Sequence, residues 1–144
     1  MTSIPAWLLP TFEVFHFIGH SLAVGTIIYL DLRLLGMNKG LPVKTLSAHI
    51  IPWTVVGLLL AMLSGSILFI ADIKAFWRNT AFTIKLVVMV LAMVNVAVFH
   101  FGIFRSVEQW DINVETPLAA KLGGLASIAL WIGVIILGRL IAYF

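Results

Sequence analysis

The chain has no cysteine and little charge, and each of these two absences excludes a class of protein. Without cysteine there can be no disulfide, no thiolate metal site and no cysteine-ligated iron–sulfur cluster. Charged residues make up 10% of the 144 residues, whereas a soluble domain carries about 25%. Hydrophobic residues make up 62%, and the mean hydropathy is +1.13. This composition indicates an integral membrane protein and leaves no room for a separate soluble domain.

The sequence contains four long apolar segments. Each approaches or exceeds the ~20 residues that a helix needs to cross the hydrocarbon core of a bilayer. The connections between them are short, which favours antiparallel neighbours. We therefore expect residues 1–144 to form one all-α domain, a four-helix transmembrane bundle of up-down-up-down topology. The four expected spans are Ile4–Leu30, His49–Ala71, Thr80–Phe104 and Leu118–Phe144.

The few basic residues lie mostly in the short connections. This is the pattern of membrane orientation signals, so the basic balance does not indicate nucleic-acid binding, and we expect membrane lipid as the surrounding partner. The connections after the first and third spans hold more Lys and Arg than the opposite side, which predicts that both termini lie outside the cytoplasm. The N-terminus lacks a basic region and a cleavage site, so we expect the first span to be retained.

Tryptophans and small residues have ordinary structural interpretations. The tryptophans lie mostly near the ends of the expected spans and predict an interfacial aromatic belt. Small residues four apart in the last span predict close helix packing, and a homo-oligomer that packs through such residues stays open. The residues are Trp7, Trp53, Trp77, Trp110 and Trp131, and the pairs Ala119/Gly123 and Ala120/Gly124 with Ser127 beyond them.

Four histidines stand out against this apolar background. His16 and His20 lie one helical turn apart within the first span, whereas His49 and His100 lie at the edges of the second and third. Ionisable side chains inside a membrane are costly and tend to mark a functional site. Histidine is also a common axial ligand of haem iron and a common ligand of transition metals. All four histidines are therefore candidate metal ligands.

Depth along the helices divides the polar residues into two groups. A helix rises about 1.5 Å per residue, which places His16 about 6 Å and Lys85 about 10 Å from the middle of their spans, toward the same membrane face. Arg139 returns to that face, so one predicted cluster holds His16, His20, Lys85 and Arg139. The opposite face holds His100 and His49, near Asp31, Arg33 and Lys121. The two groups are too far apart in depth to share one iron, but His49 and His100 could form a second centre.

Each candidate also has a purely structural interpretation. His49 can lie at the interface, and His20 and His100 can bond to the backbone. Lys85 and Arg139 can extend toward the headgroups while their stems cover apolar surface. Asp31 and Arg33 have the pattern of an ion pair at the end of a helix.

The first span carries a resemblance to a known family. Phe15-His16-Phe17-Ile18-Gly19, followed by Gly25 and Tyr29-Leu30-Asp31-Leu32-Arg33, resembles the first span of the HemJ-type protoporphyrinogen oxidases, membrane proteins that bind haem b. Thr83-Ile84-Lys85-Leu86 is similar to the start of their third span. The resemblance implies a functional role for His16 and Lys85. That family has a histidine about one turn before the position of His100, where the nearby polar residue here is Asn95.

A second resemblance covers nearly the whole chain. The first-span histidine, Asp31-Leu32-Arg33-Leu34-Leu35-Gly36, Ala81-Phe82 with Lys85, Asn95, Trp131 and Gly138-Arg139 are similar to the pattern of an uncharacterised family of bacterial four-span proteins. Copper resistance protein D is a more distant likeness. These resemblances imply the same fold, bound haem b and a multi-pass place in the bacterial inner membrane, but no established reaction. In that membrane, the charge balance described above predicts periplasmic termini.

Four functions fit these residues. The leading hypothesis is a membrane b-type haem protein that moves electrons within or across the bilayer, with quinone or a redox protein as partner. One haem is expected, or two if His49 and His100 form a centre, and Lys85 or Arg139 would pair with its propionates. One alternative is a porphyrinogen oxidase, and another is a structural subunit whose histidines form hydrogen bonds between helices. A third is a permease that binds Cu or Zn at His16 and His20, although the chain has no Met-x-x-Met motif to suit copper.

Overall fold

The computed structural model describes residues 4–144, and this part of the chain is helical and contains no β-strand. Four of its helices are long and apolar enough to cross a membrane. The prediction of an all-α four-helix bundle is therefore confirmed, and the chain is a multi-pass membrane protein. The elements are α1 (Leu8–Leu34), α2 (Val43–Ala71), α3 (Ile73–Arg78), α4 (Thr80–Phe101), the 3₁₀ helix η1 (Ile103–Gln109), α5 (Leu118–Leu140) and the 3₁₀ helix η2 (Ile141–Tyr143).

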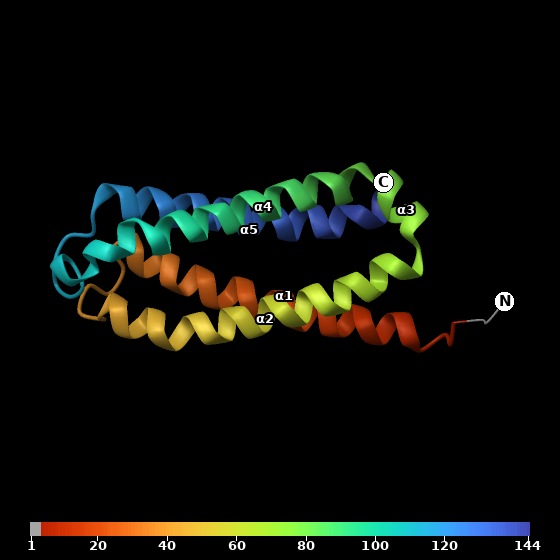
Figure 1. Ribbon diagram of the computed structural model, residues 1–144, viewed down its shortest axis with the longest axis horizontal. Helices are drawn as coiled ribbons and strands as arrows, with labels where there is room; N and C mark the ends of the chain where they lie inside the picture. The colour runs from red at the N-terminus through yellow and green to blue at the C-terminus, as the bar shows by residue number, and fades with distance from the viewer. Residues whose placement is uncertain (1–3) are drawn as a thin grey trace.

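The long helices form two antiparallel hairpins that lie side by side (Figure 1). The connections 35–42 and 102–117 lie together at one end of the bundle, which we name the loop end. Both chain termini and α3 lie at the opposite end, the terminal end. Within each hairpin, α1 packs along α2 and α4 along α5; the hairpins meet through α1 and α5, whereas α2 and α4 barely touch.

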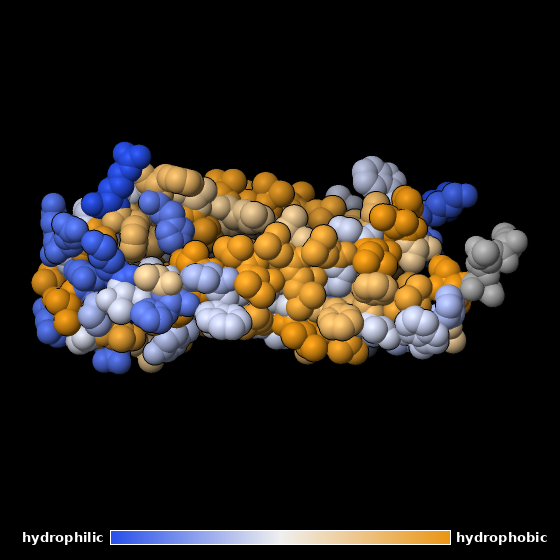
Figure 2. All heavy atoms as spheres, turned by 60° about the horizontal axis from the view of Figure 1, so that its bottom comes forward, coloured by the Kyte–Doolittle hydropathy of each residue, from blue (hydrophilic) through white to orange (hydrophobic). Residues whose placement is uncertain are grey.

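The surface separates by polarity along the long axis (Figure 2). Hydrophilic residues gather at the loop end, and hydrophobic residues cover most of the middle of the visible face. Many large apolar side chains on all four long helices are exposed. An exposed apolar band of this kind is suited to contact with lipid.

The helix ends differ from the expected span ends because of local turn chemistry. Helix α1 continues past Leu30 to Leu34, where a Schellman motif ends it: Met37 N–H donates to Leu32 C=O and Gly36 N–H to Arg33 C=O. Gly36 has φ of 109°, a conformation that suits glycine. At its other end the helix begins at Leu8 and not at Ile4.

The other boundaries shift for similar reasons. Helix α2 begins at Val43, six residues before the expected start at His49, directly after the extended Pro42. Helix α4 ends at Phe101 and not at Phe104, and η1 follows it. The expected connection after α2 contains the short helix α3, which Asp72 caps by accepting from the Ala75 N–H at 3.1 Å.

Two apolar core clusters fill the interior. One lies toward the loop end and includes Leu30, Phe99 and Trp110, and the other lies near mid-bundle and is centred on Trp131. Trp110 and Trp131 are thus buried, which corrects the expectation of an interfacial position for these two residues.

Candidate functional site

A close crossing of α1 and α2 sets the position of the first-span histidines. A Cβ atom on Gly19 would lie 2.7 Å from the Ala61 nitrogen and 2.8 Å from the Gly57 oxygen, and one on Gly57 would lie 2.6 Å from the Ala23 nitrogen. Real Cβ atoms do not approach other atoms this closely, so only glycine fits at these two positions. The two glycines bring the backbones into contact and place the next turn of α1 directly against α2.

The His16 side chain uses this contact to fix its ring. Its Nδ1 lies 2.8 Å from the Ala61 carbonyl oxygen, and because a carbonyl only accepts, Nδ1 must be the protonated donor. Gly65 leaves the space for the ring, since a Cβ there would lie 2.9 Å from His16 Cε1. The other ring nitrogen, Nε2, keeps its lone pair. A histidine that donates one N–H to a carbonyl and presents the other nitrogen has the arrangement of most histidine metal ligands.

His20 lies one turn further along α1 and faces the same region. Its ring centroid is 6.1 Å from that of His16, and its Nε2 is buried without a hydrogen-bond partner among residues 4–144. The structural interpretation, a bond to a backbone carbonyl, is not what the structure shows. An unpartnered buried ring nitrogen is costly, and a bound group that supplies a partner would remove this cost.

Lys85 of α4 completes the cluster, as the depth estimate predicted. The residue is 9% exposed, and its ammonium lies close enough to His16 and His20 to act on both rings electrostatically. Gly138 of α5 lies beside it, since a Cβ there would be in ordinary contact with Lys85 Nζ at 3.4 Å. Lys85 makes no hydrogen bond and no salt bridge to any residue that the structure describes. The cluster therefore consists of two half-buried histidines and one buried lysine, and no acidic side chain within residues 4–144 pairs with the lysine.

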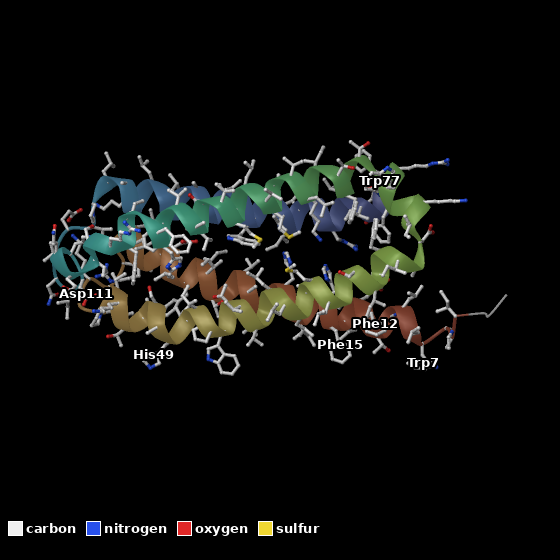
Figure 3. The ribbon with its side chains drawn as sticks, in the orientation of Figure 1. Trp7, Phe12, Phe15, His49, Trp77 and Asp111 are labelled. Carbon is white, nitrogen blue, oxygen red and sulfur yellow. The ribbon has the colours of Figure 1, made fainter. Side chains whose placement is uncertain are left out.

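Two of the predicted site residues lie elsewhere. Arg139 is exposed and its guanidinium lies 5.8 Å from the centroid of the Tyr143 ring, so it does not join the His16 cluster. His49 is exposed, bonds through Nδ1 to the Thr45 carbonyl at 2.8 Å, and points away from the bundle (Figure 3). The exposure of both side chains agrees with their structural interpretations, an interfacial His49 and an Arg139 that extends away from the core. Depth had grouped Arg139 with His16 because depth does not determine which way a side chain faces.

His100 points inward, unlike His49, so the structure does not bring these two histidines together. Its ring lies against Phe99 and Phe104, with centroids 5.3 Å and 5.6 Å away. It also lines a groove of about 180 Å³ between α2 and α4, together with Trp131. The buried Nε1 of Trp131 has no hydrogen-bond partner within residues 4–144. The groove is thus an apolar opening with an unused N–H donor.

Arg33 does not form the expected ion pair with Asp31. Its side chain is buried and donates to three loop carbonyls, of Leu41 at 2.7 Å, Lys39 at 3.2 Å and Asp111 at 3.2 Å. These bonds tie the two connections of the loop end together. Arg33 therefore stabilises the loops, and Asp31 has no basic partner among residues 4–144.

Outside the spans, the loop end carries a small charge network. Glu115 pairs with both Lys121 and Lys39. The hydrogen bond from Lys121, and then that from Lys39, lowers the pKa of Glu115 to about 2. The loops 35–42 and 102–117 are thus joined by charge as well as by Arg33.

The comparisons with known proteins identify no relative. No protein-family model, no curated protein and no solved structure matches the chain. Within residues 4–144, no group of three or more His, Cys, Asp or Glu side chains gathers where it could hold a metal ion. The argument for function therefore depends on the His16, His20 and Lys85 cluster itself.

Proposed function

We propose that the chain is a membrane b-type haem protein that transfers electrons within or across the bilayer, with His16 as an axial ligand. The observation that carries the proposal is the fixed orientation of the His16 ring, whose Nδ1 is committed to Ala61 while Nε2 remains available. Haem b, when bound, takes up and releases one electron at its iron. The residues of the chain would hold it, orient it and exclude water.

Lys85 supports haem over a bare metal ion. A buried ammonium with no acidic partner attracts an anionic group, and the propionates of haem are carboxylates. A bare transition-metal cation, by contrast, would be repelled by the same ammonium. The permease hypothesis, with Cu or Zn at His16 and His20, gains no support from this arrangement.

The position of His20 also supports a haem, which is a flat group, bound next to His16. The unpartnered ring nitrogen of His20 lies next to the His16 ring, and the two histidines share one face of α1 because they are one turn apart. His16 is the better ligand, because the hydrogen bond from Nδ1 to the Ala61 carbonyl holds its ring. His20 would then pack beside the bound group or supply the alternative ligand.

The α2–α4 groove is where we propose that a quinone acts as electron partner. Its volume of about 180 Å³ is that of a small ring site, since cavities of ~150 Å³ bind benzene. Trp131 Nε1–H would donate to a quinone carbonyl. The protein would lie in a bacterial inner membrane, with periplasmic termini because the loop end holds the excess of Lys and Arg. It would also form a homo-oligomer in which Ala119 and Gly123 face a second copy.

The test is the haem content of variants with one histidine changed. The wild type, purified in detergent, should show a Soret band that shifts on reduction with dithionite. His16→Ala should lose most of the haem measured as the pyridine haemochrome. His49→Ala is the matched control, since its side chain is exposed and points away, and should keep its haem. A colourless wild type, or full haem in His16→Ala, contradicts the proposal.

A further inference from the structure

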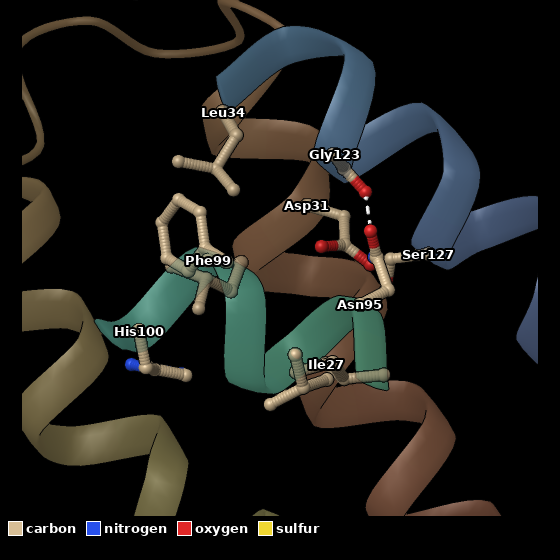
Figure 4. Close-up of a pocket in the computed structure, with 10 residues that line it drawn as sticks. Ile27, Asp31, Leu34, Asn95, Phe99, His100, Gly123 and Ser127 are labelled. Atoms are coloured by element: carbon tan, nitrogen blue, oxygen red, sulfur yellow. Dashed lines mark hydrogen bonds between the residues drawn. The ribbon is translucent and has the colours of Figure 1, made fainter. Parts of the chain in front are cut away.

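A second polar site lies near the loop end, in a small cavity between α1, α4 and α5 (Figure 4). Its volume is about 20 Å³, enough for one occupant of the size of a water molecule. Polar side chains from all three helices line it, namely Asp31 of α1, Asn95 and His100 of α4, and Ser127 of α5. The rest of its wall is apolar.

Two of the polar side chains of this cavity are almost fully buried. Asp31 is 4% exposed and Ser127 is 3% exposed. The two side chains lie near each other, but neither Asp31 Oδ2 nor Ser127 Oγ makes a hydrogen bond of ordinary geometry to any residue that the structure describes. Asn95 donates through Nδ2 to the Gly123 carbonyl at 3.0 Å, which leaves its amide oxygen as an acceptor. Oxygen atoms are thus the unused ligands of the site.

Within residues 4–144, no basic side chain forms an ion pair with Asp31. Arg33, on the same helix, is committed to loop carbonyls. Lys121 of α5 is bonded to Glu115. His100 lines the cavity, but no hydrogen bond joins it to Asp31 within residues 4–144. An ionised carboxylate in such a place is costly unless a positive charge accompanies it.

We propose that this cavity binds one small monovalent cation, Na⁺, with Asp31, Ser127 and Asn95 as its side-chain ligands. Hard cations take oxygen ligands from carboxylates, amide carbonyls and water. The three residues offer both carboxylate oxygens, the hydroxyl and the amide oxygen. The site is separate from the His16 cluster and shares no side chain with it.

Charge and size select this occupant. One carboxylate and one monovalent cation leave the site neutral, whereas a divalent ion would leave a net positive charge in the interior of the bundle. The cavity of about 20 Å³ has room for one ion, and Na⁺ is favoured over the larger K⁺ because a smaller hard cation is satisfied by fewer oxygen ligands. Na⁺ would also join α1, α4 and α5, and thus the two hairpins, at one point.

The experiment measures thermal unfolding of the full-length protein in detergent at fixed pH and constant total chloride. NaCl is titrated against choline chloride, and KCl is titrated in parallel. The wild type should gain thermal stability with NaCl along a saturating one-site curve and gain little with KCl. Bound Na⁺ should also broaden the sodium NMR line of the wild type.

Variants separate a specific site from a general salt effect. Asp31→Asn keeps the shape of the side chain and should abolish both the Na⁺ response and the line broadening. Ser127→Ala removes one neutral ligand and should raise the Na⁺ concentration at half-saturation about tenfold. Glu13→Gln, which removes an exposed carboxylate from the same helix, should leave the response unchanged.

Three results would contradict the proposed Na⁺ site. If the wild type unfolds identically in NaCl and choline chloride, with an unchanged sodium line, no Na⁺ binds, and the carboxyl group is neutralised by a proton. Equal responses to Na⁺ and K⁺ would refute the argument from size. Loss of the response in Glu13→Gln would show a general charge effect. If Asp31→Asn does not fold, Ser127→Ala and the wild-type salt series still decide the question.

Discussion

A single methyl group on Gly57 tests whether the crossing of α1 and α2 holds the first hairpin together. In Gly57→Ala, the new Cβ would lie 2.6 Å from the Ala23 nitrogen and 2.7 Å from the Gly19 oxygen. Ordinary contact begins at 3.4 Å, so the helices must separate by about 0.8 Å. The opposing atoms belong to the backbone and cannot rotate away. The strain must therefore be relieved by moving a whole helix.

The expected loss of stability follows from two opposing terms. Overpacking of this kind costs about 1–3 kcal/mol. Alanine is a better helix former than glycine and offsets up to about 1 kcal/mol of that cost. We expect Gly57→Ala to lower the free energy of unfolding by about 2 kcal/mol, since a backbone clash lies at the upper end of the overpacking range.

Gly25→Ala is the matched control, because a Cβ at that position meets nothing within 4 Å. This variant should be neutral or slightly stabilising. The assay is reversible unfolding in mixed micelles, followed by far-ultraviolet circular dichroism. A Gly57→Ala variant as stable as Gly25→Ala would refute the close crossing, and with it the geometry that places His16 against α2.

Three further outcomes are expected. Gly65→Ala puts a Cβ 2.9 Å from His16 Cε1, which should push the ring off its carbonyl, lower the haem content and shift the Soret band; an unchanged spectrum would count against this position of His16. Lys85→Met keeps the apolar stem and should lower haem occupancy or shift the midpoint potential in a redox titration; if neither changes, Lys85 is only an anchor. Hydrogen bonds from Lys121 and Lys39 lower the pKa of Glu115 to about 2. The ion pairs of Glu115 therefore contribute their full stability above its ordinary pKa, and this stability is lost as the pH falls through about 2. Thermal stability should thus decline on acidification over this window, and less steeply in Glu115→Gln; equal slopes would show that these pairs do not contribute.

Depth could be predicted from the sequence because the rise of a helix is constant. His16 and Lys85 lie on different helices, yet counting residues from the middle of each span was enough to place them side by side. The same counting located the loop-end residues. What it could not provide was direction around the helix near the span ends, where the expected bounds were several residues off. Counting grouped Arg139 with His16, and His49 with His100, for this reason, whereas the exposed positions of Arg139 and His49 agree with their structural interpretations.

The pairing of Asp31 with Arg33 failed for a different reason. Residues two apart on a helix do not face each other, so Asp31 points to α4 and α5 while Arg33 reaches the loop carbonyls. The role of Ser127 was underestimated, because the small-residue stripe that it shares with Ala120 and Gly124 indicates packing. The signal was present in the sequence: a stripe that packs close to α1 also brings its one hydroxyl close to Asp31.

The contacts between the two hairpins explain why polar groups can be buried in so apolar a chain. In lipid there is little hydrophobic force between helices, so close contacts between small residues must hold them together. Gly124 provides one such contact between the hairpins, since a Cβ there would lie 3.2 Å from the Asp31 carbonyl oxygen. The apolar cluster around Trp131 lies between this contact and the His16 cluster. Each polar site is thus enclosed by different residues, so loss of haem in His16→Ala and loss of the Na⁺ response in Asp31→Asn should occur independently.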